Sequence, residues 1–447
     1  MKQYEKYKPT KISWIGEVPS HWRETKLKYI GYLYSGLTGK GGNDFKQLGN
    51  TQNKPFIPFT NIANNERISP KQLEEVLITD DDNQNKVEKG DLFFMMSSEN
   101  FDDVGKSTIL LDDLGEVYLN SFCKGYRITD KNVNPLYLNY LLLNYPYRRR
   151  LMIEANGFTR INLKMEKVND FEITLPPKDE QTAIANFLEK KTADIDKLIL
   201  NKQKLIELLK EEKTAIINNA VTKGINSKVK LKPTNNIWIG DIPEHWKIVK
   251  CNHYIRLRHG YQFMNYDFTP EGIKVVKITQ LNPDGTLDLS SATFIDESRL
   301  QEFQDILINV GDILMALTGG TIGKIIRVTE VNEPLLQNYR VGNFFPANKH
   351  MDKDFMFWIL SSEIILNQIF FEQRETGQPN IGKENFNSMN IALPPLEEQI
   401  QIAKAIKTGT EKIKETISKI ETEILLMKEY RAALISEAVT GKIKLTA

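Results

Sequence analysis

The stretch WIGEVPSHW at residues 14–22 returns as WIGDIPEHW at residues 238–246. A second block behaves in the same way, because ITLPPKDEQ at residues 173–181 recurs as IALPPLEEQ at residues 391–399. The offset is 224 residues for the first pair and 218 for the second, so the chain is a tandem duplication whose internal loops differ in length. A period of this size indicates two whole domains rather than a solenoid, whose repeats span roughly 20–50 residues.

The Pro-Pro dipeptide of each second block precedes a segment with helical periodicity. Acidic residues follow the prolines at once, where they complement the positive end of a helix dipole. Apolar residues at alternating spacings of four and three predict a coiled-coil seam, and we expect the two helices to pack antiparallel because each apolar stripe needs a partner. The predicted seam residues are Ile184, Leu188, Ile195, Leu198, Leu205, Leu209 and Ile216, then Ile402, Ile406, Ile413, Ile420, Met427 and Leu434.

The segments before the two helices have the pattern of globular domains. Short β-rich runs lie at residues 56–62, 91–96, 117–128, 273–281 and 312–317, and apolar helix-like stretches follow at 135–156 and 351–372. The sequence therefore predicts an α+β fold, with two tandem-repeated α+β domains and two long helices packed as an antiparallel coiled coil of pseudo-twofold symmetry. The predicted boundaries are 1–176 and 227–394 for the domains, and 177–226 and 395–447 for the helices.

Composition places the chain among ordinary globular proteins, with 40% hydrophobic and 26% charged residues. The net charge is +1, so a nucleic acid would have to be met by local basic patches. Two cysteines, Cys123 and Cys251, are too few for a disulfide framework and lack zinc-site spacing. No segment approaches the roughly 18 apolar residues that span a bilayer, so we expect a cytoplasmic protein without a membrane partner.

Motifs for catalysis are missing from the sequence. The closest approach to a phosphate loop, at residues 319–324, is followed by Ile325 where the motif needs Ser or Thr. His21 and His245 occupy equivalent places, but the local sequence lacks the clustered acidic or thiol partner that a base or ligand would need, which favours a packing role. We therefore expect no catalytic residue, no cofactor and no metal in this chain.

Two loops in each copy carry side chains suited to DNA. Glycine allows close backbone approach, Thr and Lys can meet phosphates or base edges, and Arg and Gln make bidentate contacts with guanine and adenine. The alternative is that these are ordinary turns. The candidate residues are Ser97, Ser98, Lys106, Arg160, Asn162 and Lys164 in the first copy, and Thr318, Thr321, Lys324, Gln378, Asn380 and Lys383 in the second.

Taken together, the paired WIGxxPxHW and LPPxxEQ motifs and the long helices resemble the specificity subunit of type I restriction-modification systems, over nearly the whole chain. The resemblance implies that each domain is a target recognition domain reading one half of a bipartite, non-palindromic DNA sequence. It also implies that the helices set the spacing of the halves and dock two modification subunits, which are methyltransferases.

The same resemblance assigns the cofactors to the partner subunits. S-adenosylmethionine is expected on the modification subunits, and ATP and magnesium on restriction subunits, the motor-nucleases, whose presence stays open. The partners expected are thus double-stranded DNA and these subunits. The alternatives are a stand-alone DNA methyltransferase or nuclease with a divergent catalytic site, and a pure coiled-coil scaffold.

Overall fold

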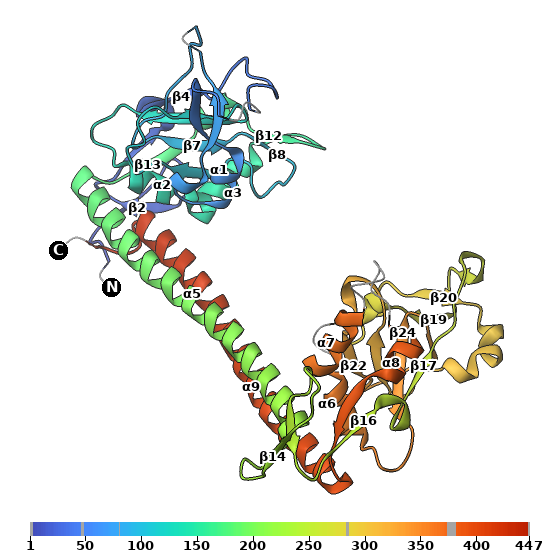
Figure 1. Cartoon of the computed structure of the whole chain (residues 1–447). Helices are drawn as coiled ribbons and strands as arrows, with labels where there is room; N and C mark the ends of the chain where they lie inside the picture. The colour runs from blue at the N-terminus through green and yellow to red at the C-terminus, as the bar shows by residue number, and fades with distance from the viewer. Residues whose placement is uncertain (1–2, 46–48, 80, 283–285, 373–380, 446–447) are drawn as a thin grey trace. The chain divides into compact units, whose positions relative to one another are not determined.

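The computed structural model describes residues 3–45, 49–79, 81–282, 286–372 and 381–445. The chain divides into two compact units: unit 1 comprises Met1–Lys202 and Thr422–Ala447, and unit 2 comprises Gln203–Glu421. Each unit holds one globular domain and one segment of each of two long helices, α5 (Lys178–Lys223) and α9 (Leu396–Val439) (Figure 1). The predicted α+β fold with two repeated domains and two long helices is confirmed.

The domain of unit 1 is built on a four-stranded antiparallel sheet. Its strands run in the order β4 (Gly31–Ser35), β11 (Cys123–Ile128), β7 (Leu92–Met95) and β9 (Ser107–Ile109). Successive side chains of a strand point to opposite faces, and Leu92 joins the core under the helices while Phe93 joins a separate core on the other side. Both faces of this strand are therefore covered, which explains its uninterrupted apolar sequence.

Smaller sheets and helices complete unit 1. A three-stranded sheet has the order β10-β5-β6, and β1 pairs with β2, β3 with β13, and β8 with β12. Their bounds are β1 Tyr7–Pro9, β2 Glu17–Pro19, β3 Arg23–Lys26, β5 Asn53–Ile57, β6 Glu74–Leu77, β8 Ser97–Ser98, β10 Tyr118–Leu119, β12 Ile161–Asn162 and β13 Glu172–Leu175. The short helices are α1 Phe59–Asn64, α2 Pro135–Leu143, α3 Tyr145–Ile153 and α4 Met165–Asn169.

The domain of unit 2 repeats this plan. One sheet has the order β17-β24-β21-β22, the other β18-β20-β19-β23, and β14 pairs with β15 and β16 with β25. The strands are β14 Leu231–Pro233, β15 Asp241–Pro243, β16 Lys247–Lys250, β17 Ile255–His259, β18 Phe268–Thr269, β19 Ile273–Val276, β20 Thr293–Ile295, β21 Ile313–Ala316, β22 Ile325–Arg327, β23 Leu335–Gln337, β24 Val341–Pro346 and β25 Asn390–Leu393. The short helices are α6 Lys353–Leu360, α7 Glu363–Glu372 and α8 Lys383–Ser388.

Several predicted elements are shorter in the structure than in the sequence analysis. The strands predicted at 91–96 and 312–317 are confirmed as β7 and β21. The strand predicted at 56–62 was wrong in its second half. There the chain leaves β5 at Ile57 and begins α1 after Pro58, whose fixed φ suits a helix start. The predicted helix at 135–156 is two helices, α2 and α3, because Asn144 between them has an extended backbone.

Buried isoleucines recur every eleven residues along both long helices. An eleven-residue repeat corresponds to 3.67 residues per turn, so the buried stripe stays nearly parallel to a straight helix axis. The predicted seam was wrong in α5 at Leu198 and Leu205, which are 50% and 43% exposed. Other predicted seam residues are buried, namely Leu188 in α5 and Ile406, Ile420 and Leu434 in α9. The isoleucines of this eleven-residue stripe, none more than 8% exposed, are Ile184, Ile195, Ile206 and Ile217 in α5 and Ile402, Ile413, Ile424 and Ile435 in α9.

In unit 1 the two helix segments run antiparallel. The Arg431 guanidinium of α9 pairs with Asp196 of α5, with 3.0 Å between Nε and Oδ1. One to two turns further along α5, Lys202 pairs with Glu423. Residue numbers therefore fall along α9 as they rise along α5, which confirms the predicted antiparallel packing in this unit.

Unit 2 shows the same direction of packing. A Cβ atom added at Gly409 of α9 would lie 3.8 Å from the Ile216 side chain of α5. At Gly224, just beyond the end of α5, an added Cβ would lie 3.3 Å from Oε1 of Glu398 in the first turn of α9. The carboxyl end of one helix segment thus meets the amino end of the other.

The apolar helices belong to the interior of the domains. Across the described ranges, no single helix is long and apolar enough to cross a membrane, although α6 and α7 together form a bent pair of sufficient length and composition. Phe355, Ile359 and Ile365 of this pair are packed in the main core of unit 2. Their hydrophobicity is therefore accounted for by the core.

Candidate nucleic-acid interface

The two repeated sequence blocks meet at one carboxylate in unit 1. Glu180, in the first turn of α5, accepts hydrogen bonds from Trp22 Nε1 at 3.0 Å and from the Tyr4 hydroxyl. Its second oxygen lies 2.8 Å from His21 Nε2. We call the contact of His21 and Trp22 with Glu180, and its counterpart in unit 2, the domain–helix clasp.

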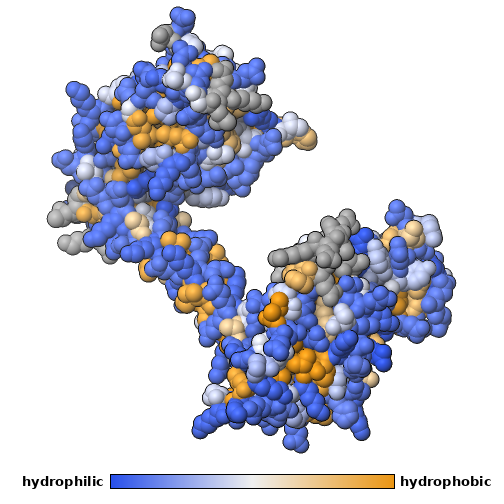
Figure 2. Space-filling model, in the orientation of Figure 1, coloured by the Kyte–Doolittle hydropathy of each residue, from blue (hydrophilic) through white to orange (hydrophobic). Residues whose placement is uncertain are grey.

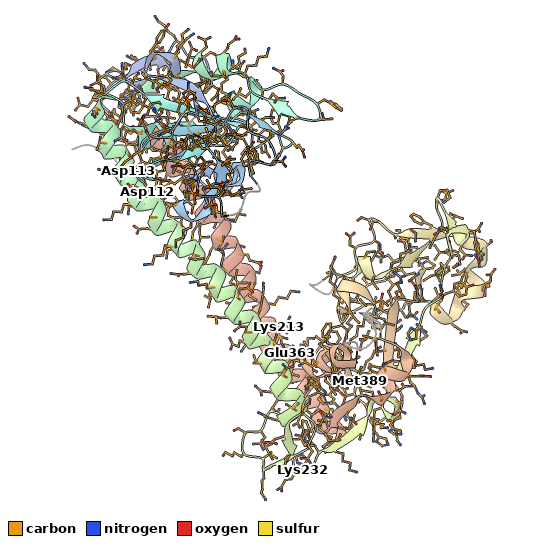
Figure 3. All side chains as sticks on the ribbon, turned by 45° about the horizontal axis from the view of Figure 1, so that its top comes forward. Asp112, Asp113, Lys213, Lys232, Glu363 and Met389 are labelled. Carbon is orange, nitrogen blue, oxygen red and sulfur yellow. The ribbon has the colours of Figure 1, made fainter. Side chains whose placement is uncertain are left out.

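The clasp of unit 2 uses the same residue types. Glu398 lies 2.8 Å from His245 Nε2 and accepts from Trp246 Nε1 at 3.1 Å. Lys232, labelled in Figure 3, donates to the Trp246 carbonyl at 2.8 Å, as Lys8 does to the Trp22 carbonyl at 2.6 Å in unit 1. The paired motifs are thus explained by the joint between each domain and a helix.

The glutamine that ends the LPPxxEQ motif completes the joint. The Gln181 amide donates to the carbonyls of Pro176 and Asn132, and its oxygen accepts from the Asn134 backbone at 2.9 Å. Gln399 makes the equivalent three bonds in unit 2. Because the acidic partners of the two histidines come from more than 150 residues away, sequence proximity did not indicate them.

In unit 1 the structure brings the two candidate loops together. Ser97 and Ser98 form β8, which pairs with β12 so that Ile161 faces Ser98 and Asn162 faces Ser97. Ser98 is buried and its hydroxyl accepts from the Asn100 backbone, whereas Ser97 is half-buried. Residues some sixty positions apart therefore share one small hairpin-like ribbon, drawn at the edge of the domain in Figure 1.

The loop before β12 presents an arginine and an aromatic ring to solvent. Asn156 and Asn162 close it with two backbone hydrogen bonds of 2.9 and 2.8 Å. Between them Phe158 is fully exposed, at 102% relative accessibility, and the Arg160 guanidinium stands 5.1 Å from the ring centre of Phe122. We call Ser97, Ser98, Phe122, Phe158, Arg160 and Asn162 the unit 1 surface.

The two candidate lysines of unit 1 have different surroundings. The Lys106 ammonium donates to the Ala63 carbonyl near the end of α1 and is half-buried. Lys164 is exposed immediately before α4. Lys106 is thus already engaged in the fold, whereas Lys164 is accessible.

In unit 2 the glycine-containing turn after β21 holds the matching candidates. The Thr318 and Thr321 hydroxyl oxygens are buried and meet no hydrogen-bond partner among the described residues. Lys324 is half-buried at the end of the turn, and Lys383 is exposed at the start of α8. Gln378 and Asn380 lie outside the described residues.

A second turn, which the sequence analysis missed, lies beside the first in both units. Asn120 Oδ1 accepts from the Phe122 backbone at 2.9 Å, and Asn338 Oδ1 accepts from the Arg340 backbone at 3.2 Å. In unit 2 the Arg340 guanidinium is 5.3 Å from the ring centre of Tyr339, and the Arg340 carbonyl accepts from Leu317 next to Thr318 at 2.9 Å. We call Thr318, Thr321, Tyr339 and Arg340 the unit 2 surface.

This turn has a weak signal in the sequence. The two asparagines are 218 residues apart, the offset that also relates the LPPxxEQ blocks. The next two residues differ between the copies, Ser-Phe in the first and Tyr-Arg in the second. Both turns nevertheless place an aromatic ring beneath an arginine, an arrangement that suits stacking on bases and pairing with phosphates.

Neither of the two thiols is activated as a nucleophile. Burial raises the pKa of the Cys123 thiol to about 12, and it raises that of Cys251 as well. In the described ranges no group of three or more His, Cys, Asp or Glu side chains is placed to hold a metal ion. The surfaces offer hydrogen bonding, stacking and positive charge, which are the means of recognition.

The fold and these surfaces define a class of protein, one that has two repeated recognition domains, each clasped to a long helix. The type I restriction modification DNA specificity domain family matches residues 19–210 and 243–425. The chain belongs to this family. As a specificity subunit it supplies DNA sequence recognition to a type I restriction-modification complex and is not the enzyme of that complex, as the sequence predicted.

Individual relatives agree with the family. The chain is 28% identical to the type I restriction enzyme MjaVIII specificity subunit of Methanocaldococcus jannaschii, over 76% of this chain and 80% of that one. It is 26% identical to the putative MjaX specificity subunit of the same organism, over 99% and 98%. A solved chain from a type I R-M system shares the fold with a TM-score of 0.68 at 14% identity, covering 95% and 99% of the two chains.

Proposed function

We propose that the unit 1 and unit 2 surfaces each read one half of a bipartite, non-palindromic DNA target. The observation that carries this proposal is the contrast inside the duplication: the clasps use the same residues, whereas the two surfaces use different ones at matching turns. Phe122 with Arg160 in one unit and Tyr339 with Arg340 in the other would present different side chains to a groove, because only tyrosine adds a hydroxyl to the arginine. Two different half-sequences are therefore expected.

The long helices support a proposal for the protein partners. In unit 1 the exposed apolar side chains of the helix pair include Leu198, Leu200, Leu425, Leu426 and Tyr430, each at least 50% exposed. Leu205 and Leu208 are the corresponding exposed residues of α5 in unit 2. Figure 2 shows hydrophobic residues on this helical part of the surface, where a partner would bury them. We assign these faces to two modification subunits, one for each unit.

Cofactor chemistry belongs to the partners in this proposal. The modification subunits carry S-adenosylmethionine and methylate adenines, and restriction subunits, where present, use ATP and magnesium. The role of this chain is to place the target for them.

The length of the paired helices is proposed to set the number of unread base pairs between the half-sequences. Four residues added to both helices contribute about 6 Å of rise and turn each helix only about 40° beyond one full turn. The isoleucine stripe is then roughly preserved, and the unread segment should lengthen by about two base pairs. Two added residues would turn the stripe by about 200° and should abolish assembly.

The decisive experiment exchanges residues 1–176 for the first domain of another member of the family. The exchanged chain is expressed with its modification subunits, and methylated adenines are mapped across the genome. One half-sequence should change and the other should stay. If both halves change, or neither does, the proposed division of labour is wrong.

A further inference from the structure

The domain of unit 2 has a cavity next to the unit 2 surface. Its volume is about 370 Å³. Asn338, Tyr339 and Arg340, in the turn that follows β23, form one wall. Lys277, immediately after β19, forms another. Phe263 and Phe268 supply aromatic walls, and Gln262, Asn265, Ile278 and Thr279 complete the lining.

The charge of this cavity separates it from two others of similar size. A cavity of about 430 Å³ in unit 1 is lined by Glu88, Asp91 and Asp130 besides its cations, and Arg127 forms ion pairs with the first two. A cavity of about 320 Å³ in unit 2 includes Glu330 and Glu333 in its lining. The cavity beside Arg340 is lined by two cations and, among the described residues, by no carboxylate.

The two cations have no acidic partner in the described parts of the chain. The Lys277 ammonium stands 4.3 Å from the ring centre of Phe268, and burial lowers its pKa. Arg340 donates from Nε to the Tyr339 hydroxyl at 2.7 Å. Asp267, which precedes the lining residue Phe268 in the sequence, is paired with Arg299 at 2.8 Å. An anion entering the cavity would therefore relieve the cost of partly desolvated, unpaired positive charge.

The cavity has the composition of a site for a sugar-phosphate unit. Lysine and arginine serve the phosphate, amides and hydroxyls serve its remaining oxygens, and aromatic walls suit the apolar face of a sugar. Contacts of this kind fix the register of a protein on DNA without reading its sequence. The cavity borders the turn that carries Arg340, so a strand contacted by the unit 2 surface has a short path into it.

We infer that this cavity holds one sugar-phosphate unit of the DNA backbone, gripped by Lys277 and Arg340. The inference rests on the proposed function, because it takes DNA as the ligand. It assigns to the domain of unit 2 an anchoring site beside the unit 2 surface, in which Lys277 serves the anchor alone and Arg340 belongs to both. The site should act on every DNA sequence alike.

The test uses the full complex with its modification subunits and measures duplex binding between about 50 and 300 mM KCl. Lys277→Met keeps the aliphatic stem over Phe268 and removes the charge. Lys274→Met is the matched control, because Lys274 lies on β19 three residues before Lys277, pairs with Glu333 and does not line the cavity. Arg340→Gln is the second variant, and melting temperatures establish that all variants are folded.

The expected result is a lower slope of log affinity against log salt, by about 0.9 for Lys277→Met, and no change for the control. For Lys277→Met the loss should be the same factor for a target duplex and a scrambled duplex, whereas Arg340→Gln should also lower the preference for the target because Arg340 belongs to the unit 2 surface. An unchanged slope, or a loss confined to the target duplex, would overturn the inference. Micromolar binding of deoxythymidine monophosphate, with the DNA slope unchanged, would also overturn it in favour of a small-molecule site.

These outcomes are independent of the proposed reading function. A wild-type complex with no preference for any sequence would contradict the reading function. The salt slope of Lys277→Met would still decide whether the cavity binds the backbone, because the slope is measured on any duplex.

Discussion

The domain–helix clasps and the outer surfaces of the two domains have changed to different extents since the duplication. Each clasp satisfies a buried indole donor and a histidine with one carboxylate, so any single substitution leaves a polar group without its partner. In the unit 1 and unit 2 surfaces Phe122 and Arg340 are exposed, so these positions can differ without cost to the fold. Residues that are buried and hydrogen-bonded are therefore the same in the two copies, whereas residues differ at the surfaces proposed to contact DNA.

The helix pair allows the sharpest contrast, between two adjacent residues. Ile206→Asp places a charge in the buried stripe and should lower the free energy of unfolding by about 4 kcal/mol. Leu205→Asp, one position away and 43% exposed, should change it by less than about 0.5 kcal/mol. Urea unfolding of both variants measures these changes. A larger loss for Leu205→Asp than for Ile206→Asp would favour the heptad seam over the eleven-residue stripe.

The clasps themselves should differ in strength. Glu180→Ala removes the acceptor of three side chains, including the buried Trp22 indole, and should destabilise unit 1 by about 3 kcal/mol. Glu398→Ala removes the acceptor of two and should destabilise unit 2 by about 2 kcal/mol. Thermal unfolding measures both, and Glu180→Gln, which keeps one acceptor oxygen, is expected to fall between wild type and Glu180→Ala. Equal losses in the two units would contradict the comparison.

A smaller effect is expected at the surfaces. Arg160→Ala should weaken discrimination at one position of one half-sequence by about 2 kcal/mol and leave the other half unchanged. Arg148→Ala is not a suitable control, because Arg148 holds two loop carbonyls. Arg149→Ala, a neighbour in α3, is the matched control. Mapping of methylated adenines reads out both variants, and relaxation in both halves would refute the assignment of Arg160 to one unit.

The smallest effect concerns the two thiols. Burial raises the pKa of Cys123 to about 12, and it raises that of Cys251 too, so both stay protonated at pH 8. A thiol reagent at pH 8 should leave both unmodified in the folded chain and modify both in urea. Mass spectrometry of the labelled protein measures this. Rapid labelling of Cys123 alone would show that the first domain opens more readily than the second.

Much of the architecture could be predicted from the sequence, because it rests on signals that repeat. The two motif pairs and the Pro-Pro helix starts marked the duplication, and apolar runs marked strands such as β7. The seam register could not be settled in the same way, since Leu198 and Ile199 are adjacent apolar residues and only three-dimensional packing distinguishes them. Surface residues such as Phe122 could not be predicted for a similar reason, because an exposed aromatic residue has the same sequence signature as a buried one.

The assignment of residues to the two units has a consequence for synthesis on the ribosome. Unit 2 is one continuous stretch, Gln203–Glu421, whereas the core of unit 1 includes Leu434, Ile435 and Val439 of the last helix. At about 5–20 residues per second, the first domain waits roughly 10–40 s for this apolar partner while unit 2 is being made. Unit 2 is therefore the first to hold all its residues, and the first domain is the one that chaperones would meet with its core incomplete.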